Sequence, residues 1–306
     1  MKKKKTKIDY KTGLIIILLI INSLFFLMFF KQGSLNFNFI NELITSKERG
    51  NLFEDINPSQ GYEINAEFGD LGPKMLDIGV IDFDKFNDVY QDGNALTDEE
   101  IDILKKGSDK KIKITKENSH FLLNFFWAVG LANKTKILDE GDMVKYSEGN
   151  AGNFASTGGW SLGKSDAMEY YSNNLLIPLT EEQEELVLEV SSNIYRPCCG
   201  NPTSFPDCNH GMALLGVLEL MASQGATEIE MYEAAKYISS FWFPSTYYDL
   251  AKYFKAKESK SFEDVMAKVI LSEEFSSANG YMNARKWLED NKLLDEVQSG
   301  GGSCGV

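Results

Sequence analysis

Residues 179–243 read LTEEQEELVLEVSSNIYRPCCGNPTSFPDCNHGMALLGVLELMASQGATEIEMYEAAKYISSFWF, and their pattern decides the fold class. Near the start of the stretch, Gln183 follows Thr180 by three residues, which is the spacing of a helix-starting capping box. Apolar residues then recur at helical spacing until Pro197, which cannot continue a helix. The pattern predicts a first helix whose apolar face carries Leu186, Val187, Val190 and Ile194.

Two more helices are expected in the same stretch. Asp207 is placed to cap a helix over about 208–223, and Gly225 follows as a C-terminal signal. Thr227 and Glu230 have the spacing of a further capping box at the start of a third helix. Three helices joined by short links predict a helical bundle, so we expect a mainly α fold.

The flanking segments extend this helical domain to 117–298. Residues 120–133 read HFLLNFFWAVGLAN, a densely apolar run that is too short for a membrane span and therefore predicts a buried core helix bounded by Asn118 and Asn133. A Gly-rich connection packed by Trp160 is expected at 148–164. Further helices are expected at 247–256, 261–275 and 280–294, before a flexible glycine and cysteine tail at 299–306.

Residues 61–116 predict a small mixed or helical subdomain. It begins with short apolar alternation followed by a helix, and Thr97 with Glu100 marks the start of another helix. The alternating segment KKIKIT at 110–115 is typical of a short strand. The expected fold is therefore mainly α with a possible short β element.

The N-terminus carries a candidate membrane span. Residues 14–30 read LIIILLIINSLFFLMFF without a charge, and as a helix this length rises about 25 Å, close to the ~30 Å hydrocarbon core. Six lysines in the basic segment 1–13 favour a cytoplasmic N-terminus, which would leave the remainder outside the cytoplasm. A cleaved signal peptide is the alternative, but no A-x-A site follows Phe30. We therefore expect a single-pass signal anchor in the plasma membrane, with 31–60 as a stalk.

The chain is strongly acidic. Its formal net charge is −14, and the part beyond the basic N-terminal segment is more acidic still. Such a field disfavours nucleic acid and anionic lipid as partners and fits cations or basic proteins. Solubility alone would also explain the charge.

The strongest chemical signal is the stretch RPCCGNPTSFPDCNHG at 196–211. Its prolines and glycines predict a rigid loop between two helices, and it presents Cys198, Cys199, Cys208 and His210. Thiolates and imidazole are good ligands for Zn(II), and thiolates also suit Cu(I). The spacing is no standard zinc pattern, and adjacent cysteines rarely face one metal. Three of these ligands completed by His120 or by Cys304 of the tail is therefore an equal expectation.

Cys208 also has the position of a reactive thiol. At the start of a helix the free N–H groups and the dipole favour thiolate over thiol, whereas the neighbouring Asp207 opposes this by its negative charge. His210 is expected on a different face of the helix, where it need not touch Cys208. A structural alternative has two of the cysteines in a disulfide, one buried, and His210 satisfied by the backbone.

A helix, a cysteine turn, a second helix and the third-helix stretch GATEIEMYEAAKYISSFWF at 225–243 resemble the three-helix thiol oxidoreductase domain of cytochrome c maturation proteins, over about 180–243. The resemblance implies a membrane-tethered helical bundle that presents thiols outside the cytoplasm in a setting of haem or metal handling. That family carries a C-x-x-C pair, so its two active thiols are not transferred onto Cys198, Cys199 and Cys208. The aromatic residues 241–243 would also suit haem.

The expected function is a membrane-anchored, extracytoplasmic metal-binding or metal-delivery protein whose partner is a metal ion or a thiol-bearing protein. The alternative is a thiol-disulfide oxidoreductase in which Cys208 attacks and Cys198 or Cys199 resolves. A purely structural domain is the third possibility. Hydrolase chemistry is disfavoured because the chain has two histidines and lacks G-x-S-x-G.

Overall fold

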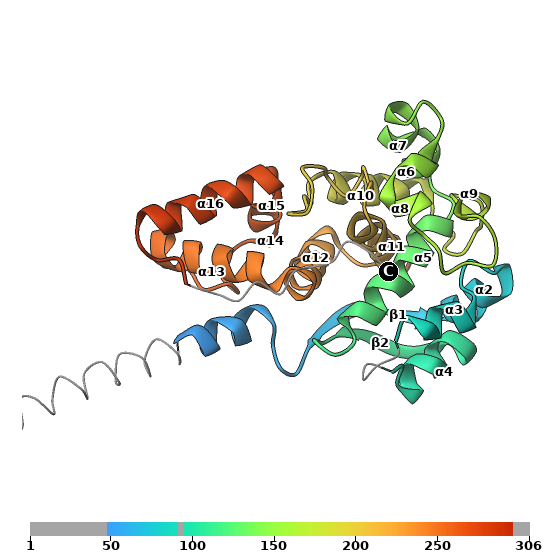
Figure 1. Cartoon of the computed structure of the whole chain (residues 1–306), viewed down its shortest axis with the longest axis horizontal. Helices are drawn as coiled ribbons and strands as arrows, with labels where there is room; N and C mark the ends of the chain where they lie inside the picture. The colour runs from blue at the N-terminus through green and yellow to red at the C-terminus, as the bar shows by residue number, and fades with distance from the viewer. Residues whose placement is uncertain (1–47, 91–94, 296–306) are drawn as a thin grey trace, which may run out of the picture. The chain divides into compact units, whose positions relative to one another are not determined.

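The structure, a computed structural model, describes residues 48–90 and 95–295. Within these residues the protein is mainly helical with one small antiparallel sheet, as expected (Figure 1). The strands are β1 (Tyr62–Gly69) and β2 (Ser108–Ile114), paired from Tyr62 opposite Ile114 to Gly69 opposite Ser108. The predicted strand at 110–115 is therefore confirmed, with its start two residues earlier.

Helices make up the rest of the regular structure. Residues 48–56 are helical. The remaining helices are α2 (Leu71–Ile78), α3 (Phe83–Asp88), α4 (Asp98–Lys106), α5 (Ser119–Ala132), α6 (Lys136–Glu140), α7 (Asp142–Tyr146), the 3-10 helix η1 (Ala151–Asn153), α8 (Ala155–Gly158), α9 (Ala167–Tyr170), α10 (Glu181–Ser192), α11 (Asn209–Ser223), α12 (Glu228–Trp242), α13 (Pro244–Glu258), α14 (Ala267–Ile270), α15 (Glu273–Ser276) and α16 (Ala278–Asp290).

Helices α5 and α11 form the centre of the core. Both are buried over nearly their whole length, as expected for a helix as apolar as α5. They pack so closely that a Cβ on Gly130 would lie 2.0 Å from the Met212 carbonyl oxygen, and one on Gly216 would lie 2.8 Å from the Gly130 nitrogen. Only glycine leaves room for this approach.

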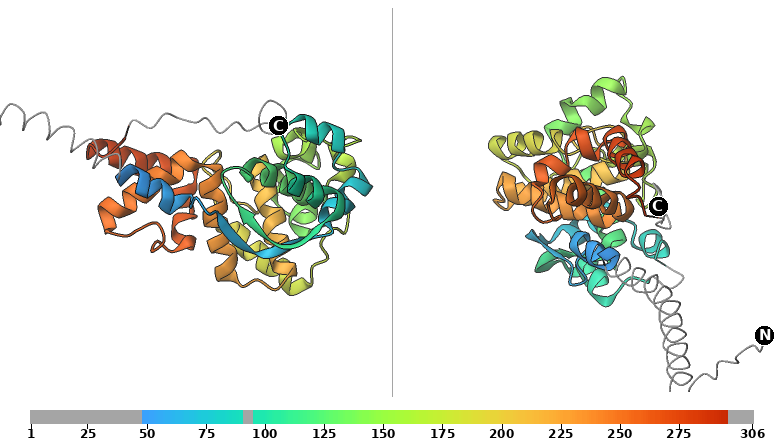
Figure 2. Two further views of the ribbon diagram at one scale, coloured as in Figure 1. Left: turned by 90° about the horizontal axis from the view of Figure 1, so that it is seen from below. Right: turned by 90° about the vertical axis from the view of Figure 1, so that its left-hand side faces the viewer.

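The sheet covers one side of these central helices, as the view from below in Figure 2 shows. Phe68 on β1 packs against Phe125 and Phe126 on α5, with ring centroids 5.3 and 6.3 Å apart. The alternation of buried and exposed residues along β1 follows from the two faces of a strand. Trp160 is buried in the Gly-rich connection and donates to the Val80 carbonyl at 2.9 Å, as its predicted packing role requires.

All three predicted capping boxes are present. Thr97, Thr180 and Thr227 each accept a hydrogen bond from the backbone N–H three residues on, and the side chain of that residue bonds back. The helices that these boxes start, α4, α10 and α12, begin where the sequence places them.

The single helix predicted at 261–275 is wrong. Two short helices, α14 and α15, occupy its second half, separated by Ser272 in an extended conformation with ψ near 168°. The Ser261 hydroxyl donates to Asp264 Oδ2 at 2.6 Å, and this side-chain hydrogen bond replaces the start of a regular helix. Serine side chains compete in this way with regular helix.

Part of the segment that was expected to form a stalk lies within the described residues. In this part of the expected stalk at 31–60, Leu52 and Ile56 are buried in the core. The Ser240 hydroxyl donates to the Ile56 carbonyl at 2.7 Å.

Among residues 48–90 and 95–295, no helix is long and apolar enough to cross a membrane. The predicted span at 14–30, the basic segment 1–13 and the tail 299–306 lie outside the described residues. Those assignments stay predictions.

Candidate thiol and metal site

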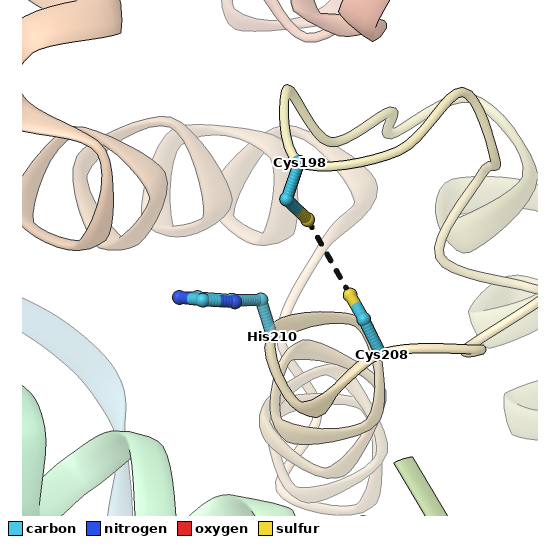
Figure 3. Close-up of side chains that lie close together, drawn as sticks. All are labelled: Cys198, Cys208 and His210. Atoms are coloured by element: carbon cyan, nitrogen blue, oxygen red, sulfur yellow. Dashed lines mark hydrogen bonds between the residues drawn. The ribbon is translucent and has the colours of Figure 1, made fainter. Parts of the chain in front are cut away.

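The site lies in the connection from α10 to α11, which folds back on itself. Tyr195 and Pro202 form an antiparallel bridge, and Thr203 N–H donates to the Ile194 carbonyl at 2.8 Å. This fold-back places Cys198, in the segment that follows α10, opposite Cys208 at the start of α11, as Figure 3 shows.

The two sulfurs are in contact. Cys198 Sγ lies 3.5 Å from Cys208 Sγ, and either atom could be the hydrogen-bond donor. Cys198 is exposed, whereas Cys199 and Cys208 are half-buried, and all three are free thiols. The disulfide that the structural alternative requires is therefore not formed among these three cysteines.

Arg196 donates hydrogen bonds to two of the sulfurs, although it was not among the residues predicted to form the site. Its side chain is 2% exposed. Its Nε donates to Cys208 Sγ at 3.3 Å, and its Nη2 donates to Cys199 Sγ at 3.3 Å and to Asp207 Oδ1 at 2.7 Å. The guanidinium lies against Gly211, where a Cβ would come within 2.7 Å of Arg196 Cζ. A signal was available, since Arg196 is the only Lys or Arg between Lys164 and Lys236.

Asp207 has a different role from the one expected. Cys208 itself caps α11, its sulfur accepting from Gly211 N–H at 3.4 Å. Asp207 instead accepts from Arg196 and from Asn201 Nδ2, the latter at 2.8 Å. The predicted cap is therefore wrong by one residue, because the carboxylate is taken up by the buried cation. This pairing also offsets the negative field that was expected to oppose a thiolate.

The thiols share their protons unequally. Hydrogen bonds from Cys198 and Cys199, together with the nearby Arg196 charge, hold the pKa of Cys208 well below its ordinary value despite burial. Hydrogen bonds to Cys199 and Cys208 raise the pKa of Cys198. The cluster as a whole therefore favours negative charge on Cys208, which sits at a helix start where the sequence placed a reactive thiol.

His210 lies closer to the sulfurs than expected. It is 3% exposed, and its ring packs on Phe243 with centroids 4.4 Å apart. Within the described residues its Nδ1 has no hydrogen-bond partner, so the backbone does not satisfy it. The donor atoms of Cys198, Cys208 and His210 all lie within 4.8 Å of one another. In Figure 3 the imidazole extends away from the two sulfurs, so full coordination requires rotation of this side chain.

The predicted ligands thus come together as two overlapping groups. Cys199, Asp207 and Cys208 form the second group, again within 4.8 Å. Because Arg196 already donates to Cys199 and Asp207, this group is occupied by a protein cation, and a metal ion is better accommodated by the first group.

His120, one of the two residues expected to complete the ligand set, is not part of these groups. His120 lies at the start of α5, where its ring meets Tyr90 at 5.2 Å and its Nε2 is 3.3 Å from Asn124 Nδ2. Cys304 lies outside the described residues. Trp242 next to the site is buried and donates to the Ser119 carbonyl at 3.0 Å, a core role that uses its polar edge.

No protein-family model matches this chain, and the comparisons with curated proteins and with solved structures gave no match either.

Proposed function

We propose that Cys198, Cys208 and His210 bind one Zn(II) or Cu(I) ion and hold it for delivery. The supporting observation is the convergence of three soft donor atoms within 4.8 Å. On a tetrahedral zinc with Zn–S bonds of about 2.3 Å, two sulfurs lie about 3.8 Å apart. The contact of 3.5 Å between Cys198 and Cys208 needs only a small opening to reach that separation.

Charge balance supports a divalent ion at this position. Two thiolates neutralise Zn(II), while Arg196 is already balanced by Asp207 at 2.7 Å. The filled site would then carry no net charge, which limits the cost of burying it. Nδ1 of His210 has no hydrogen-bond partner within the described residues, so no hydrogen bond at this atom has to break when the imidazole rotates toward the metal.

The open fourth position favours transfer over a closed structural role. Structural zinc sites use four protein ligands, whereas sites that exchange a ligand keep one position open. Cys198 is exposed. A ligand atom of a metal carrier or of a thiol-bearing protein therefore reaches the metal from the Cys198 side of the site.

The proposed setting is the outer face of the plasma membrane, with 14–30 as a single-pass anchor. The support is the uncharged run and the six lysines before it. In that setting the cysteine turn would meet metals from outside the cytoplasm, and the acidic character of the chain would attract cations.

Cobalt substitution tests the ligand set. The reduced full chain carrying Cys304→Ser should bind Co(II) with sulfur-to-metal charge-transfer absorption, because cobalt replaces zinc in thiolate sites. Cys198→Ser and Cys208→Ser should each weaken that absorption, and Cys199→Ser, held by Arg196, should retain it. A spectrum without charge-transfer absorption, or one unchanged by Cys208→Ser, would contradict the proposal.

A further inference from the structure

Cys198 and Cys208 are placed to form a disulfide with little rearrangement. A disulfide has an S–S length near 2.05 Å, and the two sulfurs stand at 3.5 Å. Cys198 sits in an exposed turn beside Gly200, where an added Cβ would meet nothing within 4 Å. The turn that carries Cys198 is thus exposed, and its sulfur needs to move only about 1.5 Å to reach bonding distance from Cys208.

The two sulfurs differ in what surrounds them. Cys198 faces solvent, whereas Cys208 accepts N–H bonds from Arg196 at 3.3 Å and from Gly211 at 3.4 Å. Donors aimed at a sulfur stabilise it when it leaves as an anion. Cys198 therefore carries the sulfur that an external thiol can reach, and Cys208 carries the sulfur that is stabilised as a leaving thiolate.

We propose that Cys198 and Cys208 form a redox-active disulfide that oxidises external dithiols, with Cys198 as the exchanging sulfur, Cys208 as the leaving sulfur and Arg196 as a positioning residue. This activity goes beyond metal binding and does not require a metal. It also reverses the order expected from sequence, in which Cys208 met the partner, because Cys198 is the exposed member of the pair.

The reaction balances with a dithiol substrate. A substrate thiolate attacks Cys198 Sγ, the S–S bond breaks, and the electron pair leaves on Cys208 as a thiolate beside Arg196. The second substrate thiolate then attacks the substrate sulfur of the mixed disulfide and releases Cys198. The substrate is oxidised to a disulfide and the protein pair is reduced to two thiols. A small external disulfide such as oxidised glutathione returns the pair to its oxidised form by the reverse steps.

Two properties follow from the contacts. Because Arg196 stabilises the reduced form, the disulfide should be oxidising rather than structural. Because the same two sulfurs serve the metal site, a chain with this disulfide cannot hold the ion through them.

Equilibration with glutathione buffers tests the proposal in the full chain carrying Cys304→Ser. The Cys198–Cys208 disulfide should form and be mapped by peptide mass spectrometry. Arg196→Lys keeps the charge but loses the planar donor fork, and it should shift the equilibrium toward the disulfide by at least about tenfold, or about 30 mV. Gly211→Ala, whose methyl would press on Arg196, should shift it in the same direction, while the matched change Gly200→Ala should not.

Trapping provides a readout that does not depend on Arg196 variants folding. In the oxidised Cys304→Ser chain, reduced glutathione followed by an alkylating quench should give the mixed disulfide on Cys198, with Cys208 released and alkylated, at least about ten times as often as the reverse product, because Cys198 is the exposed sulfur. Equal yields of the two mixed disulfides, or no Cys198–Cys208 disulfide in any buffer, would overturn the inference. Metal content measured on the same samples separates the two proposals, since disulfide exchange without metal binding would refute only the metal site.

Discussion

Burying a guanidinium costs several kcal/mol unless its charge is balanced, and the surroundings of Arg196 supply that balance. Asp207 takes one N–H at 2.7 Å, and two sulfurs take others at 3.3 Å. The same contacts stabilise negative charge on Cys208. One residue therefore ties the stability of the turn to the reactivity of its thiols.

Glu219 is a second buried ionisable residue, and it was not among the residues predicted to form a site. It lies fully buried on α11, where its Oε2 accepts from Asn133 Nδ2 at 2.9 Å and its Oε1 has no hydrogen-bond partner within the described residues. Burial raises the pKa of Glu219 to about 8, only partly opposed by its hydrogen bonds. The side chain is therefore mostly protonated at neutral pH.

This raised pKa predicts that stability falls as pH rises. Between the unfolded pKa near 4.5 and the folded value of about 8, the folded state binds the extra proton, so the free energy of unfolding decreases with pH across this window. Glu219→Gln removes the titration and should raise the free energy of unfolding at pH 8 by on the order of 3 kcal/mol, with little effect at pH 5. Urea unfolding at the two pH values measures the difference.

Glu185, an exposed acid on α10, supplies the control for the same substitution. Glu185→Gln should leave the difference in the free energy of unfolding between pH 5 and pH 8 nearly unchanged. If Glu219→Gln and wild type lose stability in parallel from pH 5 to 8, Glu219 does not titrate as described.

Residue-scale features of this kind cannot be found from local pattern. Which charged side chains are buried, and beside what, depends on contacts between distant segments, as with Asn133 and Glu219. The clustering of Cys198, Cys199, Cys208 and His210 could be predicted because all four lie within thirteen consecutive residues. The Arg196 contacts could not, although its isolation among acidic and neutral residues was visible.

At the scale of elements, helix starts were the most predictable features. The capping boxes at Thr97, Thr180 and Thr227 depend only on residues three positions apart, so local sequence determines them. The start of α11 is the exception, because tertiary contact with Arg196 takes Asp207 away from the helix end. The break between α14 and α15 is a second exception, because serine side chains form local hydrogen bonds that compete with a helical pattern.

The cap at Thr227 makes a direct prediction for α12. Thr227 accepts from Glu230 N–H at 3.4 Å, and Glu230 bonds back to the Thr227 backbone at 2.8 Å. Thr227→Ala should lower the free energy of unfolding by about 1 kcal/mol, measured by denaturant titration. Thr227→Ser keeps the hydroxyl and should lose much less. Equal losses in the two variants would assign the effect to packing instead.

At the scale of the molecule, the segment 180–243 is embedded rather than independent. Its helices α10, α11 and α12 pack with each other, but α11 also packs closely against α5 through Gly130 and Gly216. The predicted bundle was thus right in its helices. Its close packing against α5 is a non-local feature that helical periodicity alone does not specify.

The proposed membrane setting predicts which side the cysteine turn faces. In intact cells expressing the Cys304→Ser chain, after treatment with a membrane-impermeant reductant and a chelator, a membrane-impermeant maleimide should label Cys198, because it is the exposed thiol. Cys198→Ser should lose most of the label. A chain without residues 1–30 should leave the membrane fraction. Labelling that appears only after the membrane is permeabilised would contradict the proposed orientation.

The most direct test of the central claim is the metal stoichiometry of the reduced full chain. The Cys304→Ser protein should be loaded separately with Zn(II) and with Cu(I), freed of unbound ion, and assayed by elemental analysis beside a free-thiol count. We predict one equivalent of at least one of these ions, lost in Cys198→Ser and in Cys208→Ser and retained in Cys199→Ser. Less than about a tenth of an equivalent of either ion in a fully reduced chain, or undiminished binding in Cys208→Ser, would contradict a metal site at Cys198, Cys208 and His210.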